Sequence, residues 1–363
     1  MDKNFSWGKV FTFTGAIIAY LIGSGFASGQ EAMQFIAAFG VKGALGAILL
    51  TLIIYLWFSS SIMKDGYKLQ LDSSMKIFPY YCGKYLGLLF EIYTPIFLFL
   101  VLVVMISGAG AVLTQYYGLN PQVGRIIMAV LTLITVLLGL KNLVKIVSKL
   151  GPAIIIFGIA VGLANIIMNP TGILHADEVM RTIEVTKAAP TWYISGIIFP
   201  SMGCIMITHF LAEIGGTANG KKEAFFGGLF GGLAFALAVA IMAYGIMATI
   251  GDLYMQEIPA LFIARQMFSG VGIIFSLILF AGIYTTAVPM LWLSSNVLET
   301  NEKTKKFKTT AIVLTIVAFV GSQFPFSRLV NVLYPITGYL GIIFMICMLV
   351  TQIKSIFKEE KPS

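Results

Sequence analysis

The sequence predicts an all-α membrane protein with ten transmembrane helices, arranged as two halves of five helices in an inverted repeat. Three observations predict this fold class. Of the 363 residues, 58% are apolar and only 11% are charged, whereas roughly 25% of a soluble domain is charged. The apolar residues form ten segments of near-spanning length. Two of these segments, the first and the sixth, carry Gly, Ser or Pro in their middle, as the broken helices of transporters do.

The ten predicted spans are separated by polar connections. Their expected bounds are 9–38, 41–63, 86–117, 122–139, 143–168, 190–214, 223–250, 270–298, 309–325 and 327–351. Five is an odd number, so the second set of five spans would enter the membrane from the opposite side. We therefore expect a first repeat at 1–168, an external connector at 169–189, a second repeat at 190–351 and a cytoplasmic tail at 352–363.

Some segments differ from simple rods. Small residues at Ser107–Gly110 in the third span and at Gly227–Gly232 in the seventh predict close helix packing more than ligand contact. The stretch Tyr254–Ser269 is too polar to span, and its apolar spacing predicts a short external lid helix. Pro79 and the aromatic residues around it predict an interfacial piece on the other side.

The basic residues predict the orientation. With the N-terminus inside, six of the 24 Lys and Arg lie outside, and the others lie on the cytoplasmic side. The six are Lys42, Arg125, Arg181, Lys187, Arg265 and Arg328. This asymmetry places both termini in the cytoplasm and the protein in the cytoplasmic membrane. It also explains the net charge of +8 without a nucleic-acid partner.

Neither cysteine nor histidine suggests a cofactor or a metal. The three cysteines are scattered, and His175 and His209 are far apart, so we expect no disulfide framework, metal site or haem. The sequence also has no P-loop and no nucleophile with a base in reach. We therefore expect no enzyme and no cofactor beyond a coupling ion.

The two interrupted segments predict the substrate site. A break at Gly23-Ser24-Gly25 frees N–H groups at Phe26, Ala27 and Ser28 that suit a carboxylate. It also frees carbonyls near Ile22 and Gly23 that suit an ammonium or Na⁺. The alternative is that the glycines only allow helices to cross closely. The predicted substrate-binding residues are Gly23, Ser24, Gly25, Phe26, Ala27 and Ser28 in the first span, and Phe199, Ser201, Met202 and Gly203 in the sixth.

Two threonines in the eighth span predict an ion site. Thr285 and Thr286, with carbonyls of Ile22 and Gly23, would give a hard cation the oxygen ligands that it prefers. The alternative is that each hydroxyl bonds back to a carbonyl of its own helix, which is common.

Carboxylates at membrane depth are costly, so each is a functional hypothesis. Glu31 in the outer half of the first span and Arg328 at the start of the tenth are predicted to form an external gate. Alternatively, Glu31 holds a substrate ammonium or a proton. Glu213 lies four positions after His209, so the two share a helix face. Proton transfer is possible there, and a structural role for His209 is the commoner case.

Three motifs resemble those of a known group. They are Gly23-Ser24-Gly25, Ser201-Met202-Gly203 and Phe280–Thr286, and with the layout they resemble the amino acid–polyamine–organocation superfamily of transporters, which has the LeuT-type fold. The stretch Gly23–Glu31 is similar to bacterial YkvI-type membrane proteins. The resemblance implies that helices 1 and 6 are broken and that eighth-helix hydroxyls hold sodium. Glu31 departs from the pattern, because relatives carry a basic gate residue there.

Together these features predict a secondary transporter that moves a small amino acid or related zwitterion by Na⁺ symport. One alternative is the same fold coupled to H⁺. Another, from a different class, is a membrane ligand sensor such as a spore germinant-receptor subunit, which binds without transport. The sequence predicts a lipid-embedded protein and leaves the substrate's identity, the transport direction and the oligomeric state open.

Overall fold

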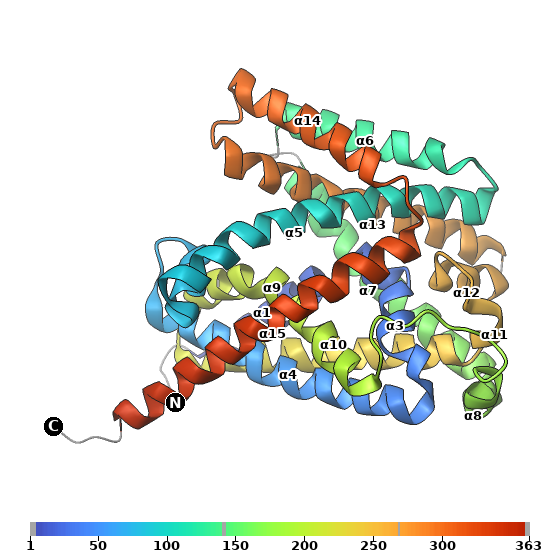
Figure 1. Ribbon diagram of the computed structural model, residues 1–363, viewed down its shortest axis with the longest axis horizontal. Helices are drawn as coiled ribbons and strands as arrows, with labels where there is room; N and C mark the ends of the chain where they lie inside the picture. Colours follow the sequence, from blue (N-terminus) through green and yellow to red (C-terminus); the bar gives the residue numbers. More distant parts are fainter. Residues whose placement is uncertain (1–4, 140–142, 268, 360–363) are drawn as a thin grey trace.

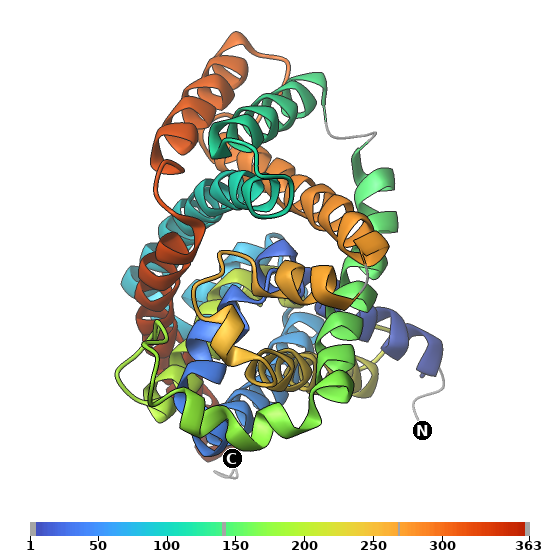
Figure 2. The ribbon, with the colours of Figure 1, turned by 90° about the vertical axis from the view of Figure 1, so that its right-hand side faces the viewer.

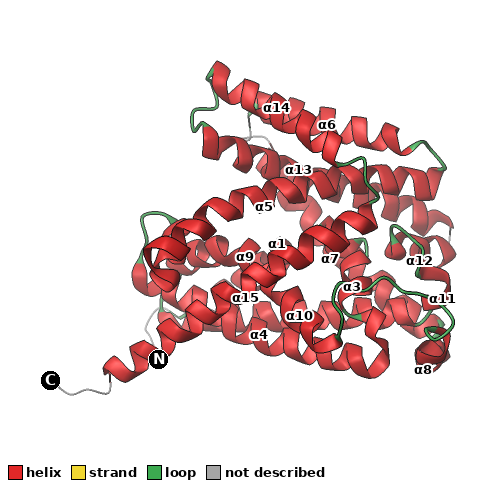
Figure 3. Cartoon of the chain, in the orientation of Figure 1, coloured by secondary structure: helices red, strands yellow, loops and turns green. Residues whose placement is uncertain are grey.

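The computed structural model describes residues 5–139, 143–267 and 269–359, which form helices and loops, and this part of the chain contains no strand (Figure 3). The helices are α1 (Trp7–Leu21), α2 (Ser24–Ala27), α3 (Gln30–Phe35), α4 (Gly40–Leu69), α5 (Ile77–Tyr117), α6 (Pro121–Leu138), α7 (Leu143–Met168), α8 (Pro170–Val179), α9 (Trp192–Gly216), α10 (Lys221–Met247), α11 (Ile250–Leu253), α12 (Pro259–Met267), α13 (Ser269–Leu298), α14 (Lys305–Gly321) and α15 (Phe326–Glu359). Two 3₁₀ turns, η1 (Ala37–Phe39) and η2 (Ser74–Lys76), complete them.

The protein is a multi-pass membrane protein. Among the described residues, seven helical segments are long and apolar enough to cross a membrane, or eight if the bent pair α7–α8 is one span. Of the other predicted spans, α1 has 15 residues and α14 has 17, below the roughly 20 residues of a straight span. The count of ten spans and the inverted repeat therefore stay predictions.

The helices form two packed groups (Figures 1 and 2). The first group contains α1, α4, α9 and α10, and the second contains α5, α6, α13 and α14. Helix α15 packs against α9 of the first group and α5 of the second. In Figure 1, α1 begins and α15 ends at the same end of the molecule. We name this end the terminal end, and the end with α3, α11 and α12 the distal end.

Glycines allow the close packing within each group, as the small-residue patches predict. A Cβ at Gly228 or Gly232 of α10 would lie 2.5 or 2.8 Å from backbone atoms of α4, at Ser59 and Tyr55. In the second group, a Cβ at Gly110 of α5 would lie 2.8 Å from the Pro121 carbonyl of α6. Bulkier residues would force these helices apart.

The first predicted span is broken, at two points. Helix α1 ends at Leu21, and Ile22 leaves the helical region with φ −87° and ψ 69°. The short α2 follows, and Gly29 then adopts φ +87°, a conformation in which glycine avoids the strain of a side chain. Ser28 stabilises this second turn, since its hydroxyl donates to the Gly25 carbonyl at 2.6 Å and accepts from the Gln30 N–H at 3.2 Å.

The predicted break of the sixth span is wrong. Helix α9 runs without interruption through Pro200, Ser201, Met202 and Gly203. Proline removes one backbone hydrogen bond, but neighbouring helices and hydroxyl groups can support a membrane helix at such a position. Here the Ser201 hydroxyl donates to the Ile197 carbonyl at 2.5 Å, and α9 packs tightly against α4 and α15, so the helix stays continuous.

The predicted lid stretch, Tyr254–Ser269, contains α12 at the distal end, and α11 directly precedes it. It contacts the broken segment directly, because the Ala260 N–H donates to the Ser28 carbonyl at 3.0 Å. At the terminal end, Gly83 with φ 69° and ψ −175° kinks α5 just after the turn that contains Pro79. Both features place irregular backbone at an end of the molecule.

Candidate functional site

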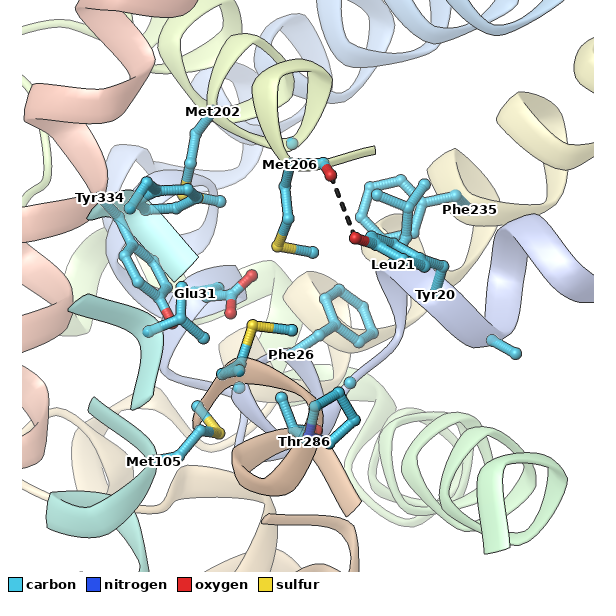
Figure 4. A pocket seen from close by; sticks show the side chains of 18 of the residues that line it. Tyr20, Leu21, Phe26, Glu31, Met105, Met202, Met206, Phe235, Thr286 and Tyr334 are labelled. Carbon is cyan, nitrogen blue, oxygen red and sulfur yellow. Dashed lines mark hydrogen bonds between the residues drawn. The ribbon is translucent and has the colours of Figure 1, made fainter. Parts of the chain in front are cut away.

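A cavity of about 220 Å³ lies beside the break in the first span, between the two helix groups (Figure 4). The broken segment forms one wall, and residues of α4, α5, α9, α10, α13 and α15 form the others. The lining residues are Ala19, Tyr20, Leu21, Gly23, Gly25, Phe26, Glu31, Tyr55, Phe97, Val101, Met105, Phe199, Met202, Gly203, Met206, Phe235, Thr285, Thr286, Pro289, Met290 and Tyr334.

The cavity brings together predicted site residues that are far apart in the sequence. The lining includes Gly23, Gly25 and Phe26 from the broken segment, Phe199, Met202 and Gly203 from α9, Thr285 and Thr286 from α13, and Glu31 from α3. The side chain of Ser24 lies outside the part of the structure that is described. Direct binding of a substrate by these residues stays a prediction.

Three predicted substrate residues do not line the cavity, because their polar groups have partners in the protein. Ser28 caps the turn at Gly29, and the Ser201 hydroxyl bonds within α9. The Ala27 N–H donates to the Gly23 carbonyl at 3.0 Å. This bond occupies the Ala27 N–H, a predicted donor to a carboxylate. It also occupies one lone pair of the Gly23 carbonyl, a predicted ion ligand.

Glu31 supplies the one carboxylate of the lining. Its residue is 7% exposed, and Figure 4 shows the carboxylate pointing into the cavity near Tyr334 and Met206. A Cβ at Gly25 would lie 2.5 Å from the Glu31 Oε1 atom, so the glycine leaves room for the carboxylate. No ion pair joins Glu31 to any residue that the structure describes.

The other walls are aromatic rings and thioethers. Phe235 lies in the middle of an aromatic cluster, with its ring centroid 5.6 Å from Phe26, 4.9 Å from Tyr55 and 6.2 Å from Phe199. The lining also contains four methionines: Met105, Met202, Met206 and Met290. Such walls are apolar and polarizable, and methionine side chains adapt to different shapes.

Tyr20 closes the cavity toward the terminal end. Its hydroxyl donates to the Met206 carbonyl at 3.2 Å and lies 3.5 Å from the His209 Nε2 atom. Its ring stacks on Phe210 with the centroids 4.6 Å apart. These contacts join α1 to α9 near the break, and the dashed line in Figure 4 marks the bond from Tyr20 to the Met206 carbonyl.

Three amide side chains, Gln30, Gln34 and Asn331, close the path toward the distal end, and we name them the amide cluster. Gln34 donates to the Gln30 Oε1 atom at 2.8 Å and accepts from the Asn331 amide at 3.0 Å. Gln30 also donates to the Gln256 carbonyl at 2.6 Å. The cluster thus joins α3, the segment before α12 and α15.

The structure does not form the predicted gate between Glu31 and Arg328. Arg328 is exposed in the first turn of α15, whereas Glu31 points into the apolar interior. A guanidinium stays in water unless a partner offsets its burial. The acid nearest the start of α15 is instead Glu257, which accepts from the Ser327 N–H at 2.8 Å.

The predicted proton pair is also separated from the cavity. Glu213 is exposed and lines a surface hollow with Gly66 and Gly216 at the terminal end. His209 contacts Tyr20 beside the cavity, and no described group bonds its Nδ1 atom. The structure therefore places His209 in the closure by Tyr20 and leaves Glu213 outside it.

The two threonines of α13 bond within their own helix. Thr285 and Thr286 both donate to the Gly282 carbonyl, at 2.9 and 3.0 Å, and both line the cavity. Thr286 Oγ1 lies 3.6 Å from the place of a Cβ on Gly23, and no described backbone N–H reaches the Ile22 carbonyl. An ion site here remains a prediction.

The sequence prediction missed Tyr55, Met105, Tyr334 and the amide cluster. Gln30 and Gln34 carry a readable signal, because two amides four residues apart share one helix face in an otherwise apolar segment. Tyr55, Met105 and Tyr334 carry none, since aromatic residues and methionines are common throughout membrane spans. Only the packing of α4, α5 and α15 brings them to the break.

Two curated proteins of similar length are similar to the chain, and no protein-family model matches it. The uncharacterized protein YyaD of Bacillus subtilis (strain 168) is 27% identical over 94% of this chain and 96% of its own. The uncharacterized membrane protein YkvI of the same organism is 24% identical over 92% of both chains. The likeness to YkvI supports a membrane protein.

Solved structures with a similar fold are transporters. The TM-score is 0.57 for Mhp1, a nucleobase-cation-symport-1 family transporter in a closed conformation with bromovinylhydantoin bound, at 17% identity over 89% of this chain and 74% of that one. It is 0.54 for a mutant of the Eremococcus coleocola manganese transporter, at 11% identity over 97% of this chain and 80% of that one. The chain therefore has a transporter-like fold.

Proposed function

We propose that this chain is a secondary transporter of the cytoplasmic membrane that moves a small ammonium-bearing solute by alternating access, either the amino acid or related zwitterion that the sequence predicts or an amine. The observation that carries the proposal is the cavity at the broken span, with separate closures on its two sides. Tyr20 forms the terminal closure and the amide cluster forms the distal one. A protein that opens one closure at a time would move a solute across without forming a continuous pore.

The two helix groups supply the moving parts. Because the cavity lies between them, a rotation of α1, α4, α9 and α10 against α5, α6, α13 and α14 would open one end and close the other. The charge pattern predicts that the terminal end faces the cytoplasm. The terminal closure is then the inner one.

Sodium is the proposed coupling ion. The supporting observations are the two α13 hydroxyls, which line the cavity, and the Ile22 carbonyl on the facing segment, which no described backbone N–H reaches. These oxygens suit a hard monovalent cation, and binding of Na⁺ would join the broken segment of one group to α13 of the other. Such a link couples the ion to the group movement.

Proton coupling is a second candidate, favoured by the single buried carboxylate in the cavity. If Glu31 released its proton when substrate bound, a proton gradient would drive transport without sodium. Glu31 lies closer to the substrate path than the predicted pair of His209 and Glu213.

The test uses purified protein in proteoliposomes, with Na⁺ and H⁺ gradients imposed separately and a panel of labelled amino acids and amines offered as solutes. Sodium-driven uptake supports the first proposal, and uptake driven only by protons supports the second. Binding without uptake or counterflow under either gradient would instead identify a ligand sensor. Protein-free liposomes and gradients collapsed with ionophores are the controls.

A further inference from the structure

The cavity has an unbalanced charge. Glu31 is its only carboxylate, and the described lining residues include no lysine, arginine or histidine. The nearest histidine, His209, contacts Tyr20 and is absent from the lining. A carboxylate away from water is costly unless it is protonated or a cation accompanies it. Among the residues that the structure describes, none offers such a cation within the cavity lining.

We infer that the substrate supplies the cation: it is an organic monocation, an amine with an apolar body and no carboxylate, whose ammonium binds Glu31. This inference rests on the proposed transport function and names the substrate class of the same site. The contact would be a charge-assisted hydrogen bond in a region of low dielectric, where such bonds are strong.

The walls suit the rest of such a molecule. The rings of Phe26 and Tyr334 line the cavity together with the Glu31 carboxylate (Figure 4), and aromatic rings can attract organic cations. Beyond them, the aromatic cluster around Phe235 and the four methionines offer apolar surface. The cavity therefore has one place for charge and a larger place for hydrocarbon.

A zwitterion fits this lining less well than a monocation. Its carboxylate would need a cation or free N–H groups, and one of the three N–H groups predicted for this role, that of Ala27, is already bonded to Gly23. Helix α2 has only four residues, so its end is a weak source of positive potential. A second carboxylate in the cavity would also be repelled by Glu31.

The cavity limits the size of the amine. Its volume of about 220 Å³ is below the roughly 300–1,000 Å³ of sites for drug-sized ligands. A single ring or a short alkyl chain with one ammonium group matches this space better than an extended polyamine.

Besides the proposed coupling ion Na⁺, whose effect the NaCl and KCl conditions of the test compare, a divalent metal is a competing cation. Among the described residues, no group of three His, Cys, Asp or Glu side chains could hold a metal, and a hard divalent ion prefers about six oxygen ligands. Glu31 with thioethers is a poor match for such an ion, so Mn²⁺ serves as a comparison ligand in the test.

The experiment measures ligand-induced stabilisation of the purified protein, in NaCl and in KCl. The probes share one body and differ in charge: 2-phenylethylamine, phenylalanine, 2-phenylethanol and 3-phenylpropanoate, with MnCl₂ as the metal arm. We expect 2-phenylethylamine to raise the melting temperature and the other probes to have little effect. Stronger stabilisation by phenylalanine, by 3-phenylpropanoate or by Mn²⁺ would overturn the inference, as would equal effects of the amine and the neutral alcohol.

Variants locate the effect. Glu31→Gln should weaken 2-phenylethylamine binding by at least about 30-fold, which equals about 2 kcal/mol. Glu91→Gln, which changes an acid of α5 that does not line the cavity, should leave it unchanged. If Glu31→Gln folds poorly, Glu31→Asp keeps the charge and should retain the preference for the amine. Unchanged amine binding in Glu31→Gln, or loss of the amine preference in Glu31→Asp, would contradict the inference.

The same probes separate this inference from the proposed function. Amine binding without uptake would support the inferred ligand class and contradict the proposed transport. Gradient-driven uptake of phenylalanine with no response to 2-phenylethylamine would support transport and contradict the inference that the substrate is an amine.

Discussion

At the scale of single residues, Gly25 and Glu31 show how backbone and charge combine at the break. Gly25 lacks a side chain where a Cβ would lie 2.5 Å from the Glu31 carboxylate. This lets an acid from the next helical segment reach the cavity. The glycine that the sequence marks as a helix breaker therefore also makes room for the one charged group of the lining.

Gly25→Ala should reduce amine binding by about tenfold or more while the protein still folds. The new Cβ would push the Glu31 side chain away from its place, and a flexible carboxylate can move at small cost. Gly15→Ala is the matched control, because a Cβ at that position in α1 meets nothing within 4 Å. Binding is measured by ligand-induced thermal shift. Equal binding by the two variants would show that Gly25 serves packing alone.

The hydroxyls of Thr285 and Thr286 test the coupling ion. Thr285→Ala combined with Thr286→Ala should lower apparent sodium affinity by about tenfold, because the cation loses two oxygen ligands. Ser294→Ala combined with Ser295→Ala is the control, since these hydroxyls bond back within the same helix and do not line the cavity. Sodium dependence of uptake is the measurement. The same dependence of uptake on sodium concentration in both double variants would contradict a sodium site at Thr285 and Thr286.

At the scale of elements, the closures of the cavity are unlike each other. The terminal closure is one tyrosine on a helix carbonyl, whereas the distal closure is an amide cluster that joins three segments. The predicted lid stretch is part of the distal closure, because Gln30 donates to the carbonyl of Gln256, which lies in that stretch just before α12. Opening the distal side thus requires movement of α3, the lid and α15 relative to one another.

Asn331→Ala should favour the state that is open at the distal end. It removes the bond from Asn331 to Gln34, at a cost to the closed state of about 1 kcal/mol, which raises the open population several-fold. The measurement is the labelling rate of a cavity cysteine by a maleimide added from the distal side. Gln70→Ala at the terminal end is the control, and an Asn331→Ala rate no faster than that control would contradict the role of the amide cluster.

The sequence predicted the first break but not the continuity of α9, for a physical reason. The stretch Gly23-Ser24-Gly25 places residues of low helix propensity inside an apolar segment of spanning length. The break can therefore be predicted from the local sequence. The effect of Pro200 instead depends on whether neighbours support the helix around it. Likewise, the depth of Glu31 and the exposure of Arg328 follow from how α3 and α15 pack, which residue type does not reveal.

At the scale of the whole molecule, the cavity lies between two helix groups, and composition alone predicted that the chain would be a membrane protein. The long apolar segments located most long helices, because bilayer thickness fixes their length. The grouping of helices could not be predicted in this way, since it depends on which glycine faces meet, such as Gly228 with Ser59. The methionines and tyrosines of the cavity follow from that grouping.

The most direct test of alternating access is the accessibility of Met202→Cys in a background without the native cysteines Cys82, Cys204 and Cys347. Met202 lines the cavity from α9, so a membrane-impermeant maleimide reaches a thiol there only through an open closure. Labelling is measured in right-side-out and inside-out vesicles, with and without the solute and the coupling ion. Alternating access predicts labelling from both sides. Addition of the solute and the ion should raise the labelling rate from one side and lower the rate from the other. Labelling from one side only, under every condition, would contradict it.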